Sequence, residues 1–263
     1  MTERKDPPTE EEKRRQEAET GKPLMPVAAA AGKSHPPKSH PVKRAFKGTL
    51  VTGLFLFLAV HLYLLALTVL PVPTTINMIL NDDPVRRQNV SLSNISPNLV
   101  YAVIAAEDSR FCAHDGIDFE AVQKAYENNQ SGGKRRGGST ISQQTAKNVI
   151  FWNGGGYLRK AGEAYVTFTI ETFWSKRRIM EVYLNVAEWG DGIYGAEGAA
   201  RIRFRKHAKD LSTREAALLA AVLPNPQKWR VDPPGPYVSG RAGTLQARMG
   251  EVRRSGYAGC VLK

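Results

Sequence analysis

Two carboxylates, followed by an aromatic residue and a histidine, end an apolar stretch of this sequence. Glu107 and Asp108 close the run LVYAVIAA, and Phe111 and His114 follow within the next six residues. Burial of a carboxylate at the edge of an apolar surface raises its pKa toward that of a useful general base. Glu107 is therefore the candidate catalytic base, with Asp108, Phe111 and His114 as supporting residues. Taken alone, such an acidic pair is more often a solvated helix end.

A second polar cluster, GSTISQQTAKN, occupies residues 138–148. Glycine followed by small hydroxyl residues lets the backbone approach a ligand closely. On a helix, Gln143 and Lys147 share one face at i and i+4, as do Gln144 and Asn148. Alone, this segment could be a capped surface helix. The side chains that it could offer to a ligand are those of Ser139, Thr140, Gln143, Gln144, Lys147 and Asn148.

A third cluster, RKAGE, places two cations and a carboxylate within five residues. On a helix, Arg159 and Glu163 lie one turn apart and could simply form a surface ion pair. Lys160 adds a charge that suits a phosphate group. The cluster therefore indicates either a solvated helix face or part of an anion-binding site.

In order and spacing, these clusters resemble the peptidoglycan glycosyltransferase domain, which bifunctional penicillin-binding proteins share with monofunctional biosynthetic transglycosylases. The segments GDGIYGAEGAA and LSTREAALLAAVLPNPQKW are similar to the monofunctional form. The resemblance covers about residues 90–245. The family motifs EDxxFxxHxG, GGSTIxQQxxKN, RKxxE and KxxILExYLN compare, in this order, with residues 107–116, 138–148, 159–163 and 176–185.

The resemblance implies a mainly α, lysozyme-like glycosyltransferase domain with a larger head lobe and a smaller, membrane-proximal jaw lobe. It implies an enzyme that polymerises lipid II, a disaccharide-pentapeptide on undecaprenyl diphosphate, into linear glycan with inversion and without transpeptidase activity. The growing strand would be the donor and lipid II the acceptor. No cofactor is required on this reading, although a divalent cation, Mg or Mn, is a candidate near Glu163.

Carried over residue by residue, the resemblance makes Glu107 the base that removes the proton from the acceptor's 4-hydroxyl. Glu163 would be a second catalytic carboxylate that orients cations. Because the diphosphate leaving group is already acidic, the site needs neutralising charge more than a strong general acid. The residues expected to bind substrate or diphosphate are Ser139, Thr140, Gln143, Gln144, Lys147, Asn148, Arg159 and Lys160.

The sequence departs from the family pattern at position 155. The family often carries a basic residue about four positions before the arginine of RKxxE, whereas this chain has Gly155 within NGGG. One phosphate contact would then be missing, or would come from Lys160, Arg135 or Arg136. Backbone N–H groups of the glycine run could also hold an anion.

Helix signals are dense from Ser96 onward, and strand-like alternation is scarce. Ser96 followed by Pro97 is a typical helix start. Ser175 can cap a helix that carries the motif at residues 176–185. Ser212 with Glu215 forms a capping box before AALLAAVL. These helices would carry the polar clusters.

Residues 48–70 contain no Asp, Glu, Lys or Arg. A helix of that length would be about 35 Å long, enough to cross a hydrocarbon core of about 30 Å. The polar leader is too long for the start of a cleaved signal peptide, so the segment is expected to be an uncleaved anchor. Basic residues concentrate before it, which predicts a cytoplasmic N-terminus and a periplasmic or otherwise extracytoplasmic catalytic domain on the inner membrane.

The chain carries a formal net charge of +12, which suggests an anionic partner. An extracytoplasmic domain makes nucleic acid a poor fit, so the expected partners are lipid II, the nascent glycan strand and inner-membrane lipids. Other cell-wall synthesis or division proteins are further candidates. The predicted parts are a disordered basic tail (1–47), the anchor (48–70), a membrane-proximal linker (71–95), the glycosyltransferase domain (96–250) and a C-terminal tail (251–263).

Two rival functions stay open at this point. A lytic transglycosylase or lysozyme-like hydrolase could also use one glutamate on a helical domain. An inactive membrane-anchored scaffold is the alternative from another class. An apolar patch around residues 118–151, with Ile150, Phe151 and Trp152 as candidates, could reach into lipid or belong to the core. Whether Cys112 and Cys260 pair is also open.

Overall fold

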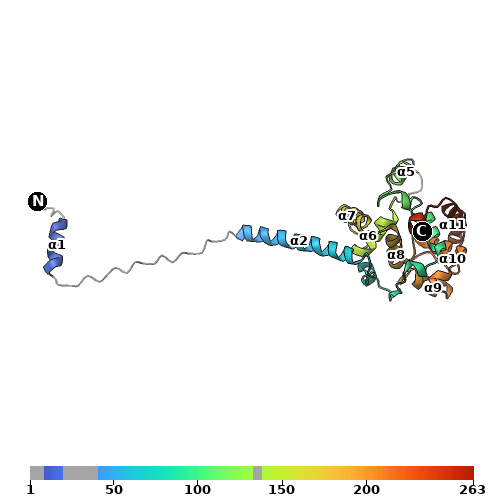
Figure 1. The fold of residues 1–263 in the computed structure, drawn as a ribbon, viewed down its shortest axis with the longest axis horizontal. Helices are drawn as coiled ribbons and strands as arrows, with labels where there is room; N and C mark the ends of the chain where they lie inside the picture. Colours follow the sequence, from blue (N-terminus) through green and yellow to red (C-terminus); the bar gives the residue numbers. More distant parts are fainter. Residues whose placement is uncertain (1–8, 20–40, 133–137) are drawn as a thin grey trace. The chain divides into compact units, whose positions relative to one another are not determined.

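Helices make up most of the regular structure in the computed structural model, which describes residues 9–19, 41–132 and 138–263 (Figure 1). The chain divides into two compact units, residues 1–54 and 55–263. In the first unit, α1 (Glu10–Glu19) forms within the tail that was predicted to be disordered. Its sequence, EEEKRRQEAE, consists almost entirely of strong helix formers. The rest of the predicted tail lies largely outside the described residues.

Among the described residues, one helix is long and apolar enough to cross a membrane. This is α2 (Pro41–Ala66), whose candidate span runs from Arg44 to Ala66. The predicted span, 48–70, therefore begins four residues after this candidate span and ends four residues after it. The helix ends at Ala66, and Leu67, in the turn that follows, is buried.

Side chains of the domain bind the carbonyl groups at the end of α2. Trp174 Nε1 donates to the Leu64 carbonyl at 2.9 Å, and Arg178 Nε donates to the Leu67 carbonyl at 2.9 Å. The last carbonyls of a helix lack partners within the helix, so these contacts satisfy groups that would otherwise need water. His61 is packed as well, since Tyr165 Oη lies 2.9 Å from its Nε2.

The predicted linker, 71–95, is part of the folded domain. It contains α3 (Ile76–Ile79), β1 (Arg86–Arg87) and the 3₁₀ turn η1 (Leu92–Asn94). Within the described residues, β1 pairs in parallel with β3 (Ile193–Tyr194), which pairs antiparallel with β2 (Glu188–Gly190). The linker lacked an obvious periodic pattern because its elements are only two to four residues long.

The remaining elements lie in the second unit, and Figure 1 shows them gathered around the C-terminus. The predicted caps at Ser96 and Ser175, and the capping box of Ser212 and Glu215, are confirmed. The prediction of a mainly helical domain is confirmed too. The helices are α4 (Pro97–Glu107), η2 (Phe111–Ala113), α5 (Phe119–Gln130), α6 (Ile141–Ile150), α7 (Tyr157–Phe173), α8 (Lys176–Val186), α9 (Ala196–Phe204), η3 (Ala208–Asp210), α10 (Thr213–Val222), α11 (Pro236–Arg254) and α12 (Gly259–Leu262).

Two sets of helices form the core that positions the polar clusters. In one set, α4, α10 and α11 pack against one another. In the other, α6 packs against both α7 and α8. The first cluster follows α4, the second opens α6 and the third lies on α7, so the polar clusters come from both sets.

Residues 251–263, predicted as a C-terminal tail, pack onto the domain instead. They contain the end of α11 and the short α12, and Val261 is fully buried. A disulfide joins Cys260 to Cys112 across 148 positions of sequence. Two isolated cysteines gave no pattern from which this pairing could be deduced.

Candidate active site

Glu107 is the last residue of α4, and its carboxylate is held by a chain of hydrogen bonds. Gln144 Nε2, on α6, donates to Glu107 Oε2 at 2.9 Å, and Tyr183 Oη, on α8, donates to Gln144 Oε1 at 3.3 Å. Burial raises the pKa of Glu107, and the Asp108 charge adds to the rise, while Gln144 and Arg241 oppose it. The structure thus has a partly buried carboxylate where the sequence analysis expected one, and the role of Glu107 as a base stays a prediction.

Arg241 was missed by the sequence analysis, although it lies inside α11. Its charge lowers the pKa of Glu107, and its Nε is buried without a hydrogen-bond partner among the described residues. The sequence carried one signal, an arginine in an otherwise weakly charged stretch, YVSGRAGTLQ. The charge of Arg241 therefore favours the ionised form of Glu107, against the cost of burial.

Arg241→Gln is expected to move the acidic limb of the pH–activity profile to higher pH. Removing a cation that favours the carboxylate raises the pKa of Glu107 further, so the unprotonated base is lost earlier as pH falls. The measurement is kcat/KM against pH for glycan synthesis. Arg253→Gln, an exposed change in the last turn of the same helix, is the matched control and should leave the limb in place. An unmoved limb in Arg241→Gln would remove this role.

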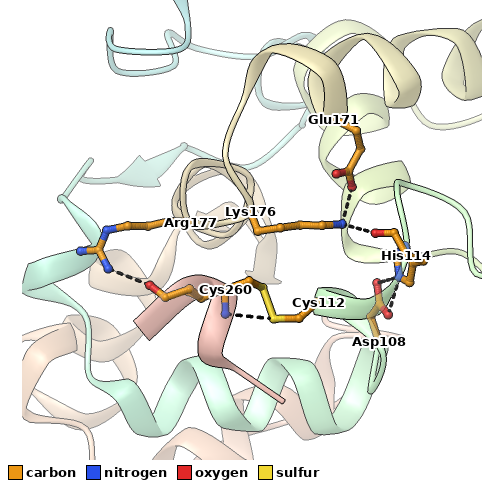
Figure 2. The surroundings of a disulfide bond; sticks show 8 residues. Asp108, Cys112, His114, Glu171, Lys176, Arg177 and Cys260 are labelled. Carbon is orange, nitrogen blue, oxygen red and sulfur yellow. Dashed lines mark hydrogen bonds and ion pairs between the residues drawn. A yellow bond between two sulfur atoms is a disulfide. The ribbon is translucent and has the colours of Figure 1, made fainter. Parts of the chain in front are cut away.

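The residues after Glu107 are fixed by a buried polar network (Figure 2). The Asp108 carboxylate accepts from the Ile141 N–H at 3.0 Å and lies 3.0 Å from His114 Nε2. Lys176 Nζ donates to the His114 carbonyl and, at 2.8 Å, to Glu171. Asp108 and His114 are thus part of the network that fixes the loop, a supporting position like the one expected from the sequence, and His114 Nδ1 is buried without a hydrogen-bond partner among the described residues. Lys176 and Glu171 were not assigned a role in advance.

Phe111, the third predicted supporting residue, is fully buried in η2. The Lys176 ammonium lies 4.7 Å from the centre of its ring, a cation–π contact. The loop between α4 and α5 is therefore anchored by one aromatic side chain and one buried network.

The third cluster forms a cationic group around one buried carboxylate. Glu163 on α7 is only 2% exposed and forms ion pairs with Arg159 and, at 3.1 Å, with Lys160. Lys160 Nζ also donates to Ser139 Oγ at 3.4 Å. Burial, followed by the charge of Arg159, lowers the pKa of both Lys147 and Lys160. These cations repel one another at short range, so a bound anion would relieve the repulsion.

Two residues expected to touch substrate, Thr140 and Gln143, form the N-terminal capping box of α6 with their side chains. Thr140 accepts from the Gln143 N–H at 3.2 Å, and Gln143 Oε1 accepts from the Thr140 N–H at 3.0 Å. Both side chains are buried. The same sequence pattern fits a capping box and a ligand-binding segment, and the structure gives these two residues the first role.

The divalent cation considered near Glu163 does not fit the charges found there. Both carboxylate oxygens of Glu163 contact cationic side chains, which would repel a metal ion. Asp108, His114 and Asp118 place ligand atoms within 4.8 Å of one another. Asp108 is already hydrogen-bonded to His114, and Asp118 caps α5, so this cluster has a structural explanation.

Gly155, where the family often carries a cation, packs directly against Arg159. Its φ is +82°, and a Cβ there would lie 3.0 Å from both Cδ and Nε of Arg159. A larger residue would therefore strain the backbone and displace the arginine. The arginines at 135 and 136, considered as substitutes, lie outside the described residues.

Gly155→Lys is expected to lower kcat by between about 10- and 100-fold, because small misplacements of a catalytic group have effects of that size. Gly154→Lys is the matched control, since Gly154 also has a positive φ but nothing lies within 4 Å of its added Cβ. The rates of glycan synthesis by the two variants are compared. Higher activity in Gly155→Lys would mean instead that position 155 gains a useful phosphate contact.

Glu107 and Gln144, which are hydrogen-bonded to each other, line two different cavities. One of about 760 Å³ is lined by Glu107, Cys112, Arg248 and Tyr257, among others. The second, of about 280 Å³, is lined by Gln144, Lys147, Asn148 and Glu188, among others. The Gln144 amide, which lines the second cavity, binds the carboxylate of Glu107, which lines the first. A base on one side and cations on the other suit proton removal from one group and stabilisation of an anion leaving another.

Comparisons with known proteins agree with this arrangement. The sequence profile of the family described as Transglycosylase matches residues 74–249. The biosynthetic peptidoglycan transglycosylase of Rhodospirillum centenum is 57% identical over 176 residues, which cover 67% of this chain and 76% of that protein. Those of Caulobacter vibrioides and Pasteurella multocida are 58% and 55% identical, over 65% and 62% of this chain and 74% and 66% of their own lengths. The match begins within the predicted linker, and it covers well over half of the sequence. This chain belongs to the transglycosylase family.

Proposed function

We propose that this chain is a biosynthetic peptidoglycan transglycosylase that polymerises lipid II into glycan strands. One observation carries the proposal: a desolvated carboxylate, Glu107, is joined through Gln144 to the cavity that contains Lys147. Transfer of a sugar from a diphosphate carrier needs both features in one site. The relatives named biosynthetic peptidoglycan transglycosylases support the same reading.

In this mechanism Glu107 accepts the proton of the acceptor's 4-hydroxyl. The oxygen attacks the donor's anomeric carbon and the bond to the diphosphate breaks, so configuration at that carbon inverts. Gln144 holds the base in place and Tyr183 holds Gln144. Because burial raises the pKa of Glu107, the carboxylate is a stronger base than an exposed glutamate would be.

The leaving diphosphate is neutralised by Lys147, Arg159 and Lys160. Glu163 orients Arg159 and Lys160 through its ion pairs, and it acts through them as a positioning residue. Ser139 is exposed beside Lys160, and Asn148 borders the cavity with Lys147, so both stay candidates for substrate contacts. Fixed charges aimed at developing negative charge are commonly the largest single contribution to catalysis.

A position at the membrane surface suits a lipid-linked substrate. The folded domain directly follows the candidate span in α2. Several apolar side chains on the surface of this domain are exposed. Phe119 and Tyr126 on α5 are 71% and 63% exposed, and Leu158 on α7 is 89% exposed. In the patch considered from the sequence, Trp152 is exposed, whereas Ile150 and Phe151 pack partly against the core. We propose that the α5 and α7 side chains contact lipid.

An extracytoplasmic domain with a cytoplasmic N-terminus is supported by two independent features. Basic residues such as Arg44 and Lys47 precede the apolar part of α2. Disulfides persist in oxidising compartments, and Cys112 is joined to Cys260. Inner-membrane lipids and the nascent strand are the proposed partners. Contacts with other cell-wall synthesis or division proteins stay a prediction.

Lipid II and finished sacculi, each incubated with the purified full-length chain, separate this function from its rivals. The expected result is long glycan with release of undecaprenyl diphosphate from lipid II, and no soluble fragments from sacculi. The hydrolase reading needs the reverse result, and the scaffold reading needs inactivity on both. A parallel lipid II reaction with EDTA tests the divalent cation, and unchanged synthesis is expected because the Glu163 site is already filled by cationic side chains.

A further inference from the structure

The disulfide between Cys112 and Cys260 lies in the loop that follows Glu107 and joins α4 to α5. Cys112 is in η2, five residues after Glu107 and two before His114, and Cys260 is in α12. Figure 2 shows the bond next to the polar network of Asp108, His114 and Lys176. None of the catalytic roles assigned above uses this bond.

The loop after Glu107 is fixed by different means on its two sides. On one side the buried network holds it, because Asp108 binds the Ile141 N–H and Lys176 binds the His114 carbonyl. On the other side η2 packs against α12, where the disulfide makes the connection covalent. The Cys260 N–H also donates to Cys112 Sγ at 3.3 Å.

The segment that carries Cys260 is short but well anchored. Val261 is fully buried, and Arg177 donates to its carbonyl at 2.7 Å, which ties α12 to α8 (Figure 2). A helix of four residues has little stability of its own, so its position depends on these contacts and on the disulfide. Cutting the bond would leave η2 held on the α12 side by packing alone.

The disulfide also forms part of the wall of the larger cavity. Cys112 and Glu107 line that cavity together with Arg248 and Tyr257, from α11 and the turn after it. A shift of η2 would therefore change the space next to the catalytic carboxylate. It would also admit water to a group whose raised pKa depends on burial.

We propose that the Cys112–Cys260 disulfide is a positioning link for Glu107, and that its reduction by a dithiol slows polymerisation while the fold persists. The dithiol supplies two electrons and two protons. The Sγ–Sγ bond breaks, two thiols form, and the reductant closes to its own disulfide. Cys260 is exposed and Cys112 is partly exposed, so the bond is within reach of a reductant. The chain contains two cysteines in all, so a dithiol acts on this bond alone.

The inference rests on the proposed function, and two readouts keep the two apart. The first is kcat and KM for lipid II, measured with the full-length chain before reduction, after reduction and after reoxidation. The second is amide hydrogen exchange, which needs no activity. The expected result is a reversible fall in kcat of about 10-fold with KM little changed, because misplacing a catalytic group acts on kcat. Amides of 108–116 should exchange faster on reduction, while those of α10 stay protected.

The acidic limb of kcat against pH provides a further readout that a purely stabilising bond would not move. Reduction should shift this limb to lower pH, because water entering the loop lowers the pKa of Glu107 toward its ordinary range. The double variant Cys112→Ser/Cys260→Ser should match the reduced enzyme and ignore the dithiol.

Equal kcat in oxidised and reduced protein, with unchanged exchange at 108–116, would overturn the positioning link and leave the proposed function intact. Failure of the oxidised protein to make glycan would count against the function instead, and hydrogen exchange would still decide the link. Should the double variant not fold, reversible reduction of the natural chain gives the same comparison.

Discussion

Glu107→Gln is expected to lower glycan synthesis from lipid II by about 10²- to 10⁴-fold, the range for losing a positioned general base. The amide keeps the shape of the side chain and can still accept from Gln144. It removes a charge whose burial is unfavourable, as the raised pKa of Glu107 shows. The melting temperature should therefore be unchanged or higher while activity is lost. Initial rates with purified lipid II and a thermal melt provide the two measurements.

Glu127→Gln is the control for this change, because it alters an exposed glutamate on α5 away from the site. It should retain the activity of the natural chain. Near-normal synthesis by Glu107→Gln would rule out Glu107 as the base, whatever happened to stability.

Lys147→Met is expected to lower kcat/KM by about 10²- to 10³-fold, as removal of one charge-stabilising group commonly does. Among the described residues, the Lys147 ammonium has no hydrogen bond or ion pair, and burial lowers its pKa. The nearby charge of Glu188 favours the ammonium only in part, and no carboxylate of the described residues pairs with it directly, which suits a group that binds an anion. Methionine preserves the length of the side chain and removes the cost of the buried charge.

Stability should change in the opposite direction in this variant. The melting temperature should be equal or up to about 4 °C higher, the shift expected for about 1 kcal/mol in a domain of this size. Lys209→Met, at an exposed position on η3, is the matched control for losing one positive charge. A variant that lost stability and kept its kcat/KM would show that Lys147 is structural.

The helical core could be predicted, and Glu107 could be singled out as the candidate base, because their signals are local. Helix starts at Ser96, Ser175 and Ser212 follow from side chains that bind nearby N–H groups. Glu107 could be singled out because an apolar helix directly precedes it. Local patterns of this kind do not depend on distant parts of the chain.

Contacts between distant segments could not be predicted in this way. The disulfide joins residues 148 positions apart, and Arg241 reaches Glu107 from a helix more than a hundred residues later. Asn185 also binds the Val90 N–H, so part of the motif KRRIMEVYLN holds the segment read as a linker. Thr140 and Gln143 show that a local pattern can also be ambiguous. The same pattern fits a capping box and a ligand-binding segment, and only the packing of the two side chains distinguishes these roles.

The pH dependence of kcat/KM for lipid II polymerisation by the natural chain is the most direct test of Glu107 as a buried base. Because burial raises the pKa of Glu107, activity should fall with decreasing pH while the solution is still above 4.5, the ordinary value of a glutamate. Glu127→Gln should leave that limb in place, and Arg241→Gln should move it upward. An acidic limb at or below 4.5 in the natural chain would contradict the account.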